Sequence, residues 1–160
     1  MLNNFIGSHE CKADSKGRLI IPSSLKKQMA DILLDGFVIK RSFYDTCIEL
    51  WPRKEYDIMS EKLCKLDQSN RANNSFLNRF LAGVKLIDID DLGRILIPKD
   101  LLIFSKIDKD VVFSSKLGII NIWDKDIFEK SIAFDDEEFA NEVEQVLGNL
   151  NKDFHGFGLS

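Results

Sequence analysis

Ala13–Pro22 reads ADSKGRLIIP, and Ile89–Pro98 reads IDDLGRILIP 76 positions later. A comparison of Gly7–Leu25 with Gly83–Leu101 without gaps gives seven identities in 19 positions, among them the Asp, Gly, Arg and Pro of each quoted stretch. Two matched copies of one unit in a chain of 160 residues indicate an internally repeated, pseudo-symmetric domain.

The first half of each copy predicts a hairpin followed by a short helix. In copy one, strand-like segments over 8–12 and 19–21 lie on either side of a polar turn, which is typical of a tight hairpin. Pro22 has no N–H to donate to a strand ladder, so we expect a helix to follow it through Met29. The corresponding residues of copy two predict the same change from strand to helix.

The second half of each copy predicts another hairpin that ends in tryptophan. Residues 36–51 and 110–123 contain the two alternating patterns, which end at Trp51 and Trp123. The offset between these tryptophans is 72 rather than 76, so copy one has four extra residues between its Pro and its Trp. We expect this insertion in the loop over 31–35, and we expect both tryptophans to pack in the core.

Helices are expected between the copies and after them. Apolar residues recur at helical spacing between the two copies, and Asp135–Leu150 predicts an amphipathic helix with an acidic face. The residues beyond Asn151 lack periodicity and are expected to fray. The predicted organisation is repeat 1 over 5–53, a helical linker over 54–80, repeat 2 over 81–127, and an acidic C-terminal helix with a frayed tail over 128–160.

The charge of the chain is unevenly distributed. The net charge is −4, but residues 1–80 carry 13 Lys and Arg against 10 Asp and Glu, whereas residues 81–160 carry 9 against 16. A basic face is therefore compatible with an acidic average. No signal-like N-terminus or membrane-length apolar run occurs in the sequence, and we expect a cytoplasmic protein.

The sequence predicts neither an enzyme nor a metal site. The only histidines, His9 and His155, are far apart, and His9 with Cys11 lacks the two further ligands that zinc requires. Asp90 and Asp91 are adjacent, so on a strand they would point to opposite faces and could not act as an acid–base pair. We therefore expect no catalytic residue, metal, cofactor or small-molecule substrate.

The chemistry of the repeated motif lies in its Asp and Arg, which are four positions apart. Asp14 can pair with Arg18, and Asp90 with Arg94, because the two ends of a tight turn are close together. A guanidinium held in a fixed orientation suits phosphate oxygens or the O6 and N7 edge of guanine. The recurrence of the pair in both copies favours a binding role over that of an incidental surface ion pair.

The two turns differ in their other residues. Gly17 and Gly93 each allow a positive φ and a close approach of another group. Lys16 adds a second, mobile positive charge to the first turn, whereas Leu92 occupies that position in the second and Asp91 adds a negative charge. We expect Arg18, with Lys16 beside it, to make the stronger contact with a ligand and Arg94, with Asp91 beside it, to make the weaker one.

The chain resembles the MraZ family of bacterial transcriptional regulators over about residues 1–150. The resemblance is carried by the two Asp-x-x-x-Arg motifs, by the ELWP strand end at 49–52 and by the linker that leads to Leu81–Gly83. It implies an α+β fold in which two pseudo-symmetric AbrB-like double-hairpin (swapped-hairpin) units share a β core, with a helical linker and a C-terminal helix.

The resemblance also implies a function. The family is expected to bind short direct repeats of double-stranded DNA upstream of the cell-division and cell-wall gene cluster as a homo-oligomeric ring, which would associate the protein with the nucleoid. Its DNA contacts carry over to Arg18 and Arg94, and His9, Lys12 or Lys85 would supplement them. A ring would raise a low affinity per subunit through avidity.

A second function remains open from the sequence. AbrB-like hairpins also occur in antitoxin-like proteins, and the acidic amphipathic segment Asp135–Leu150 could bind a groove on a partner protein. The alternative is that this helix packs on its own body or on a neighbouring subunit. Deletion of residues 135–160 distinguishes these possibilities.

Overall fold

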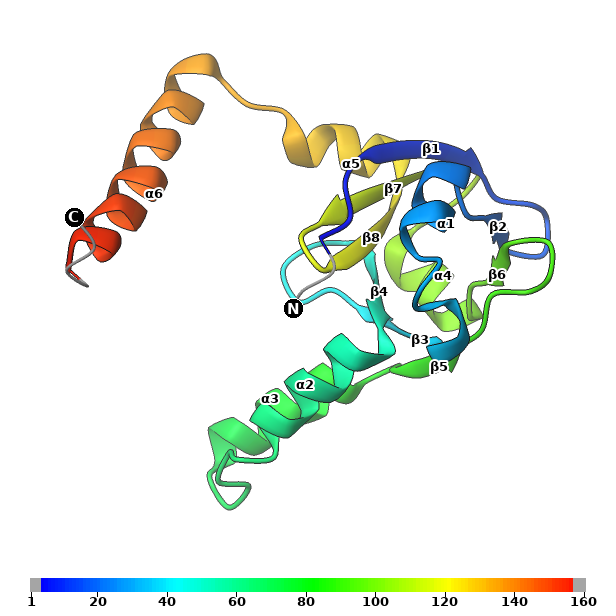
Figure 1. Cartoon of the computed structure of the whole chain (residues 1–160), viewed down its shortest axis with the longest axis horizontal. Coiled ribbons are helices and arrows are strands. Elements are labelled where there is room, and N and C mark those ends of the chain that lie inside the picture. The colour runs from blue at the N-terminus through cyan, green and yellow to red at the C-terminus, as the bar shows by residue number, and fades with distance from the viewer. Residues whose placement is uncertain (1–3, 157–160) are drawn as a thin grey trace. The chain divides into compact units, whose positions relative to one another are not determined.

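The structure of the chain, a computed structural model, describes residues 4–156 (Figure 1). The chain divides into a main unit, Met1–Phe128, and a C-terminal unit, Glu129–Ser160. The strands of the main unit are β1 (Ser8–Lys12), β2 (Arg18–Ile20), β3 (Phe37–Arg41), β4 (Ile48–Pro52), β5 (Lys85–Ile87), β6 (Arg94–Leu96), β7 (Asp110–Lys116) and β8 (Ile119–Asp124). The helices are α1 (Ser23–Gln28), the 3-10 turn η1 (Leu33–Asp35), α2 (Arg53–Leu63), α3 (Arg71–Leu81), α4 (Lys99–Ser105), α5 (Lys125–Ile132) and α6 (Asp136–Gly156).

The strands of the two repeats interleave in two antiparallel sheets. The larger sheet has six strands in the order β1-β7-β8-β4-β3-β5, and β2 and β6 form a separate two-stranded sheet. Each outer strand of the larger sheet therefore pairs with a strand of the other repeat. The α+β fold with two pseudo-symmetric units and a shared β core is confirmed.

The hairpin predicted for the first half of each copy is wrong. β1 pairs with β7 and not with β2, β5 pairs with β3 and not with β6, and β2 and β6 pair with each other. The physical reason is burial, because pairing across the repeats places Leu19 opposite Ile95 in the shared core. The hairpins of the second halves, β3–β4 and β7–β8, are confirmed.

The register locates the insertion in copy one differently from the sequence. Val38 faces Trp51 and Val112 faces Trp123, so the offset between the copies is 74 at the valines and 72 at the tryptophans. Two extra residues therefore precede β3, near η1, and the other two lie in the β3–β4 connection. The prediction that all four lie over 31–35 is wrong.

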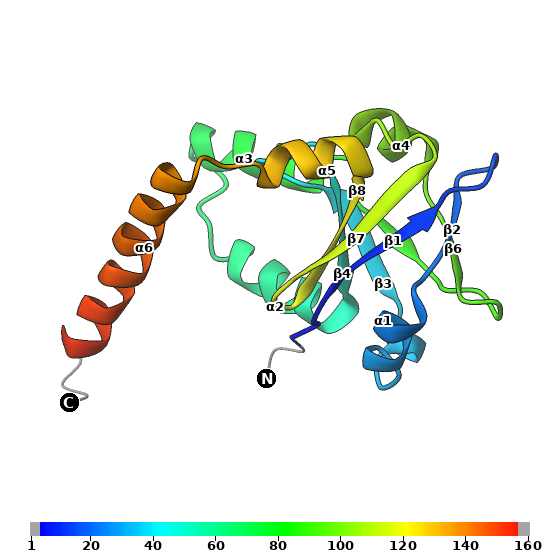
Figure 2. The same cartoon turned by 90° about the horizontal axis from the view of Figure 1, so that it is seen from above.

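Side chains from both repeats form one core on one side of the larger sheet. Figure 2 shows α1, α4 and the β2–β6 ribbon on that side, and the α2–α3 pair on the other. The main buried cluster is contributed by β2, β6, α1, α4 and alternate positions of the larger sheet, for example Leu19, Leu25, Phe37, Leu101 and Phe113. This core fixes the ribbon in place.

Helices follow Pro22, Pro52 and Pro98, because a proline at the helix start loses no hydrogen bond. Trp51 and Trp123 are buried as expected. In the C-terminal unit, α6 continues to Gly156, beyond the helix end predicted at Leu150, and residues 157–160 of the expected frayed tail lie outside the described residues. The sequence did not anticipate α5.

Candidate nucleic-acid interface

The β2–β6 ribbon presents both motif arginines on one face. Its register sets Arg18 opposite Leu96 and Ile20 opposite Arg94. Side chains alternate along a strand, so the buried Leu19 and Ile95 point into the core and these four residues share the outer face. The turns before β2 and β6 project from the same end of the main unit (Figure 2).

In the first turn, Asp14 holds the backbone and the side chain of Arg18. Its Oδ2 atom accepts a hydrogen bond of 2.6 Å from Arg18 Nε, and its Oδ1 atom accepts bonds of 2.9 Å from the backbone N–H groups of Lys16 and Arg18. The backbone N–H of Gly17 donates to the carbonyl oxygen of Asp14 at 3.1 Å. One carboxylate therefore sets both the turn and the guanidinium.

The second turn has the same geometry. Asp90 Oδ2 accepts from Arg94 Nε at 2.8 Å, and Oδ1 accepts from the backbone N–H groups of Leu92 and Arg94 at 2.9 and 2.8 Å. The N–H of Gly93 donates to the carbonyl of Asp90 at 2.9 Å. The two arginines are thus held in equivalent orientations, as the repeat predicted for the pairs.

Hydrogen bonds hold both carboxylates in their charged form. The pKa of Asp14 is lowered, chiefly by the bond from the backbone N–H of Arg18, and the pKa of Asp90 is lowered in the same way by Arg94. The ion pairs use only Nε of each arginine, and within residues 4–152 neither arginine donates a hydrogen bond from its Nη groups. These donors are available to a ligand.

Each turn is also fastened to the other repeat. The N–H of Ile21 donates to the carbonyl of Gly93 at 2.9 Å, and the N–H of Ile97 donates to that of Gly17 at 3.0 Å. Gly17 and Gly93 have φ values of 80° and 75°, which favour glycine. The spacing between the two turns is therefore set by the backbone of both repeats.

The helices approach the turns in the same exchanged manner. A Cβ atom placed on Gly93 would lie 3.1 Å from Lys26 Nζ on α1, and one placed on Gly17 would lie 2.7 Å from Leu102 Cδ1 on α4. Lys26 and Leu102 occupy equivalent positions, 76 residues apart. Lys26 could not be recognised from the sequence, because only the exchanged pairing brings it to the second turn.

The supplementary residues have different surroundings. Lys12 is exposed at the end of β1, whereas His9 is half-buried in the same strand. Lys85 Nζ donates to Asp100 Oδ1 at 3.0 Å and is engaged within the protein. Ile20 and Leu96, which the sequence did not mark as candidates, are 61 and 58% exposed on the outer face of the ribbon.

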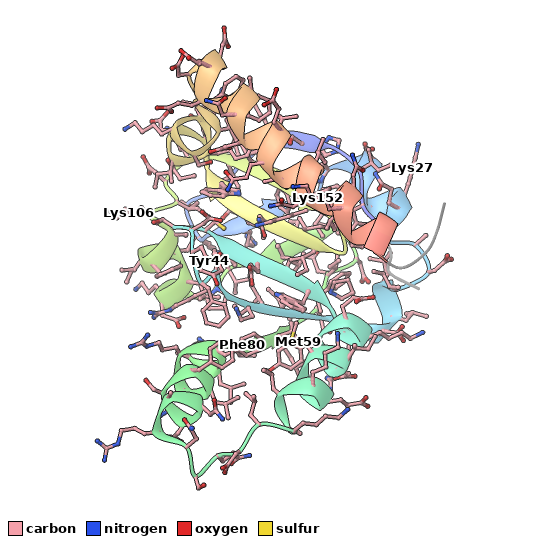
Figure 3. All side chains as sticks on the ribbon, turned by 90° about the vertical axis from the view of Figure 1, so that its left-hand side faces the viewer. Lys27, Tyr44, Met59, Phe80, Lys106 and Lys152 are labelled. Carbon is pink, nitrogen blue, oxygen red and sulfur yellow. The ribbon has the colours of Figure 1, made fainter. Side chains whose placement is uncertain are left out.

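A second feature lies on the opposite side of the larger sheet, beside α2 and α3. Lys40 is 1% exposed there, and its Nζ donates to Glu49 Oε1 at 3.1 Å and lies over the ring of Phe80. Next to this cluster is a cavity of about 580 Å³, and Figure 3 labels Tyr44, Met59 and Phe80 from its lining. The described side chains that line this cavity are mainly aromatic, charged and aliphatic, and none of them is an arginine.

The described residues contain no cluster of His, Cys, Asp and Glu that could hold a metal ion. None of the helices described is long and apolar enough to cross a membrane. The fold and the candidate site thus define a protein with two swapped-hairpin repeats. Each repeat contributes one arginine-bearing turn, and the two turns have the same geometry.

Comparisons with known proteins identify the family. The model of the family described as "MraZ protein, putative antitoxin-like" matches residues 4–79 and 80–150. A protein of Flavobacterium psychrophilum named transcriptional regulator MraZ is 50% identical over 155 residues, which cover 97% of this chain and 99% of that protein. Proteins with the same name from Christiangramia forsetii and Clostridium tetani are 46 and 32% identical, over 96 and 89% of this chain and 97 and 98% of theirs. The chain belongs to the MraZ family and is a transcriptional regulator, not an enzyme.

Proposed function

We propose that the protein binds double-stranded DNA through the outer face of the β2–β6 ribbon and its two turns. The observation that supports this most is that Arg18 and Arg94 are held by equivalent aspartates on paired strands, with their Nη groups unbonded within residues 4–152. A two-stranded ribbon fits the major groove, where arginine reads guanine by two hydrogen bonds. The exposed Ile20 and Leu96 would there meet thymine methyl groups or sugar edges.

Lys16 supplements the arginines in this proposal. It is exposed in the first turn, and no carboxylate pairs with it within residues 4–152. Asp14 and Asp90 act by orienting the guanidinium groups, and Gly17 and Gly93 act by allowing the turns. Because Arg18, Arg94 and Lys16 would contact DNA through positive charges, binding should weaken steeply as salt rises.

The DNA target proposed here is a set of short direct repeats upstream of the cell-division and cell-wall gene cluster, bound by a ring of subunits. One chain presents few basic side chains on the ribbon, so its affinity for a single repeat should be low, and linked subunits would raise it by avidity. A head-to-tail assembly presents the same face repeatedly, which suits direct repeats. Equal affinities of an isolated subunit for one repeat and of the assembly for the array would contradict the ring.

A footprint on the DNA upstream of the protein's own gene tests this proposal. We expect protection at a regular spacing with the wild-type chain, and loss of protection with the Arg18→Ala/Arg94→Ala double variant. A footprint of unchanged strength with the double variant would overturn the assignment of the ribbon. Irregular protection that still depends on both arginines would retain the DNA site and overturn the repeat target.

The alternative is an antitoxin-like or other interaction function through α6. Five apolar residues at helical spacing on this helix are exposed, namely Phe139, Val143, Val146, Leu147 and Leu150. Acidic residues crowd its first turn. If residues 135–160 are deleted, loss of a specific co-purified protein with retained DNA binding favours this alternative, whereas loss of self-assembly favours packing between copies.

A further inference from the structure

We propose that Lys26 is a DNA-phosphate contact of the second turn, supplied by the helix of the first repeat. This inference rests on the proposed DNA-binding function and concerns the composition of the same surface. The two turns differ in positive charge in the sequence, because Leu92 of the second turn occupies the position of Lys16 in the first. The folded chain changes this inequality, because residues far from the turns in sequence flank them.

The position of Lys26 follows from the exchange between repeats. Its Nζ lies 3.1 Å, and its Cδ and Cε 3.5 Å, from the place where a Cβ on Gly93 would lie, so its side chain runs along the second turn. At the first turn, the equivalent contact is made by Leu102. Only a glycine at position 93 leaves room for the lysine in its present position.

Each turn therefore has one lysine and one leucine beside it. In each case one of the two belongs to the turn itself and the other to a helix of the other repeat. The first turn has Lys16 from its own loop and Leu102 from α4, and the second has Leu92 from its own loop and Lys26 from α1. The positive charge missing from the second motif is replaced from the other repeat. Two turns with similar cationic groups suit two phosphate positions on one duplex better than a basic turn and an acidic one.

The ammonium group of Lys26 is available for such a contact. Within residues 4–152, no carboxylate forms an ion pair with it, whereas Lys85 and Lys54 are paired with Asp100 and Asp35. The residue is half-buried, so its aliphatic stem is held against the protein while its charged end lies at the turn. A held stem reduces the entropy that a lysine loses on binding phosphate.

The test is a salt titration of DNA binding by the full chain carrying Lys26→Ala. The probes are a duplex from the upstream region and a random duplex of equal length. We expect weaker binding to both and a slope of log affinity against log salt that falls by about one for each engaged subunit. Lys26→Arg should restore the slope, and Lys27→Ala, which changes an exposed neighbour on the same helix, should leave it near wild type.

Combinations of Lys26→Ala with the arginine variants separate the possible outcomes. The effect of Lys26→Ala should be smaller in an Arg94→Ala background than in an Arg18→Ala background, because Lys26 and Arg94 act at the same turn. A wild-type titration for Lys26→Ala, with weakened binding for Arg94→Ala, would overturn this inference alone. If Arg18→Ala and Arg94→Ala also bind like wild type, the proposed DNA surface itself is wrong. Leu102→Lys should increase the slope by adding a second lysine beside the first turn, and an unchanged slope for a folded Leu102→Lys would contradict the exchanged arrangement.

Discussion

The backbone N–H of Ile21 donates a hydrogen bond of 2.9 Å to the carbonyl oxygen of Gly93, so the strand end of the first repeat closes the turn of the second. The equivalent bond from Ile97 reaches Gly17. Neither turn is therefore an independent hairpin tip. Each turn contains hydrogen bonds from both repeats, so a substitution in one repeat should alter the position of the arginine in the other.

Replacement of the turn glycines should destabilise the protein unequally. Gly17→Ala and Gly93→Ala both place a Cβ at positive φ, which costs about 1–2 kcal/mol. Gly17→Ala should cost more, because its Cβ would meet Leu102 Cδ1 at 2.7 Å, whereas Lys26 can move its flexible end away from position 93. Urea denaturation measures both. Equal losses, or a larger loss for Gly93→Ala, would contradict the packing of the two helices.

The carboxyl groups of Asp14 and Asp90 should titrate below 3.8, their ordinary pKa. Because the pKa is lower in the folded chain than in the unfolded one, the stabilisation is present above the unfolded value and is lost as the pH falls through the folded value. NMR of the side-chain carboxyl carbons measures the midpoints. In Arg18→Ala the Asp14 midpoint should rise only partway, since the backbone N–H of residue 18 still donates to it. A midpoint at or above 3.8 in the wild type would contradict the turn geometry.

The three cysteines should differ sharply in reactivity. Burial raises the pKa of Cys11 to about 11 and that of Cys47 to about 12, so few of their thiols are ionised near neutrality. Cys64 is exposed at the end of α2. Alkylation near pH 8 followed by mass spectrometry should modify Cys64 first, and Cys64→Ser should remove the fast phase. Rapid modification of Cys47 in the folded protein would contradict its burial.

Glu49→Gln should destabilise the chain, because it leaves the buried ammonium group of Lys40 without its charged partner. Lys40 is 1% exposed and forms its ion pair with Glu49, and loss of the partner of a buried charge costs about 3 kcal/mol. As a control, Asp57→Asn breaks the exposed pair with Arg53 and should change the free energy of unfolding by no more than about 0.5 kcal/mol. Urea denaturation that shows equal, small effects for both would show that Lys40 is not dependent on Glu49.

The sequence predicted the local geometry of the site well and its long-range pairing poorly. Asp14 and Arg18 are four residues apart and meet within one turn, so spacing alone predicts their ion pair. The partner of β2 is different, because an alternating three-residue strand can bury Leu19 against any apolar neighbour, and pairing with β1 or with β6 satisfies the same pattern. The resemblance to the MraZ family implied two units with a shared β core, but the pairing of β2 with β6 and of β1 with β7 is known only from the structure.

The same distinction explains why Lys26 was missed. In sequence it is one of two adjacent lysines on a short helix, a pattern typical of a solvated face. Lys26 and Gly93 are 67 positions apart in the sequence. They come together only because the helix of the first repeat lies beside the turn of the second. Its counterpart, Leu102, gives no hint either, since apolar residues in α4 are also expected to face the core.

The most direct test of the account is a salt titration of binding to the upstream duplex by wild type, Arg18→Ala, Arg94→Ala and Arg53→Ala. Arg53 is a matched control, because it also pairs through Nε with an aspartate four residues away, at 3.0 Å, but lies on α2 away from the ribbon. We expect weaker binding and a smaller salt slope for the first two variants, with wild-type behaviour for the third. Wild-type titrations for both ribbon arginines, or an equal loss for all three variants, would contradict it.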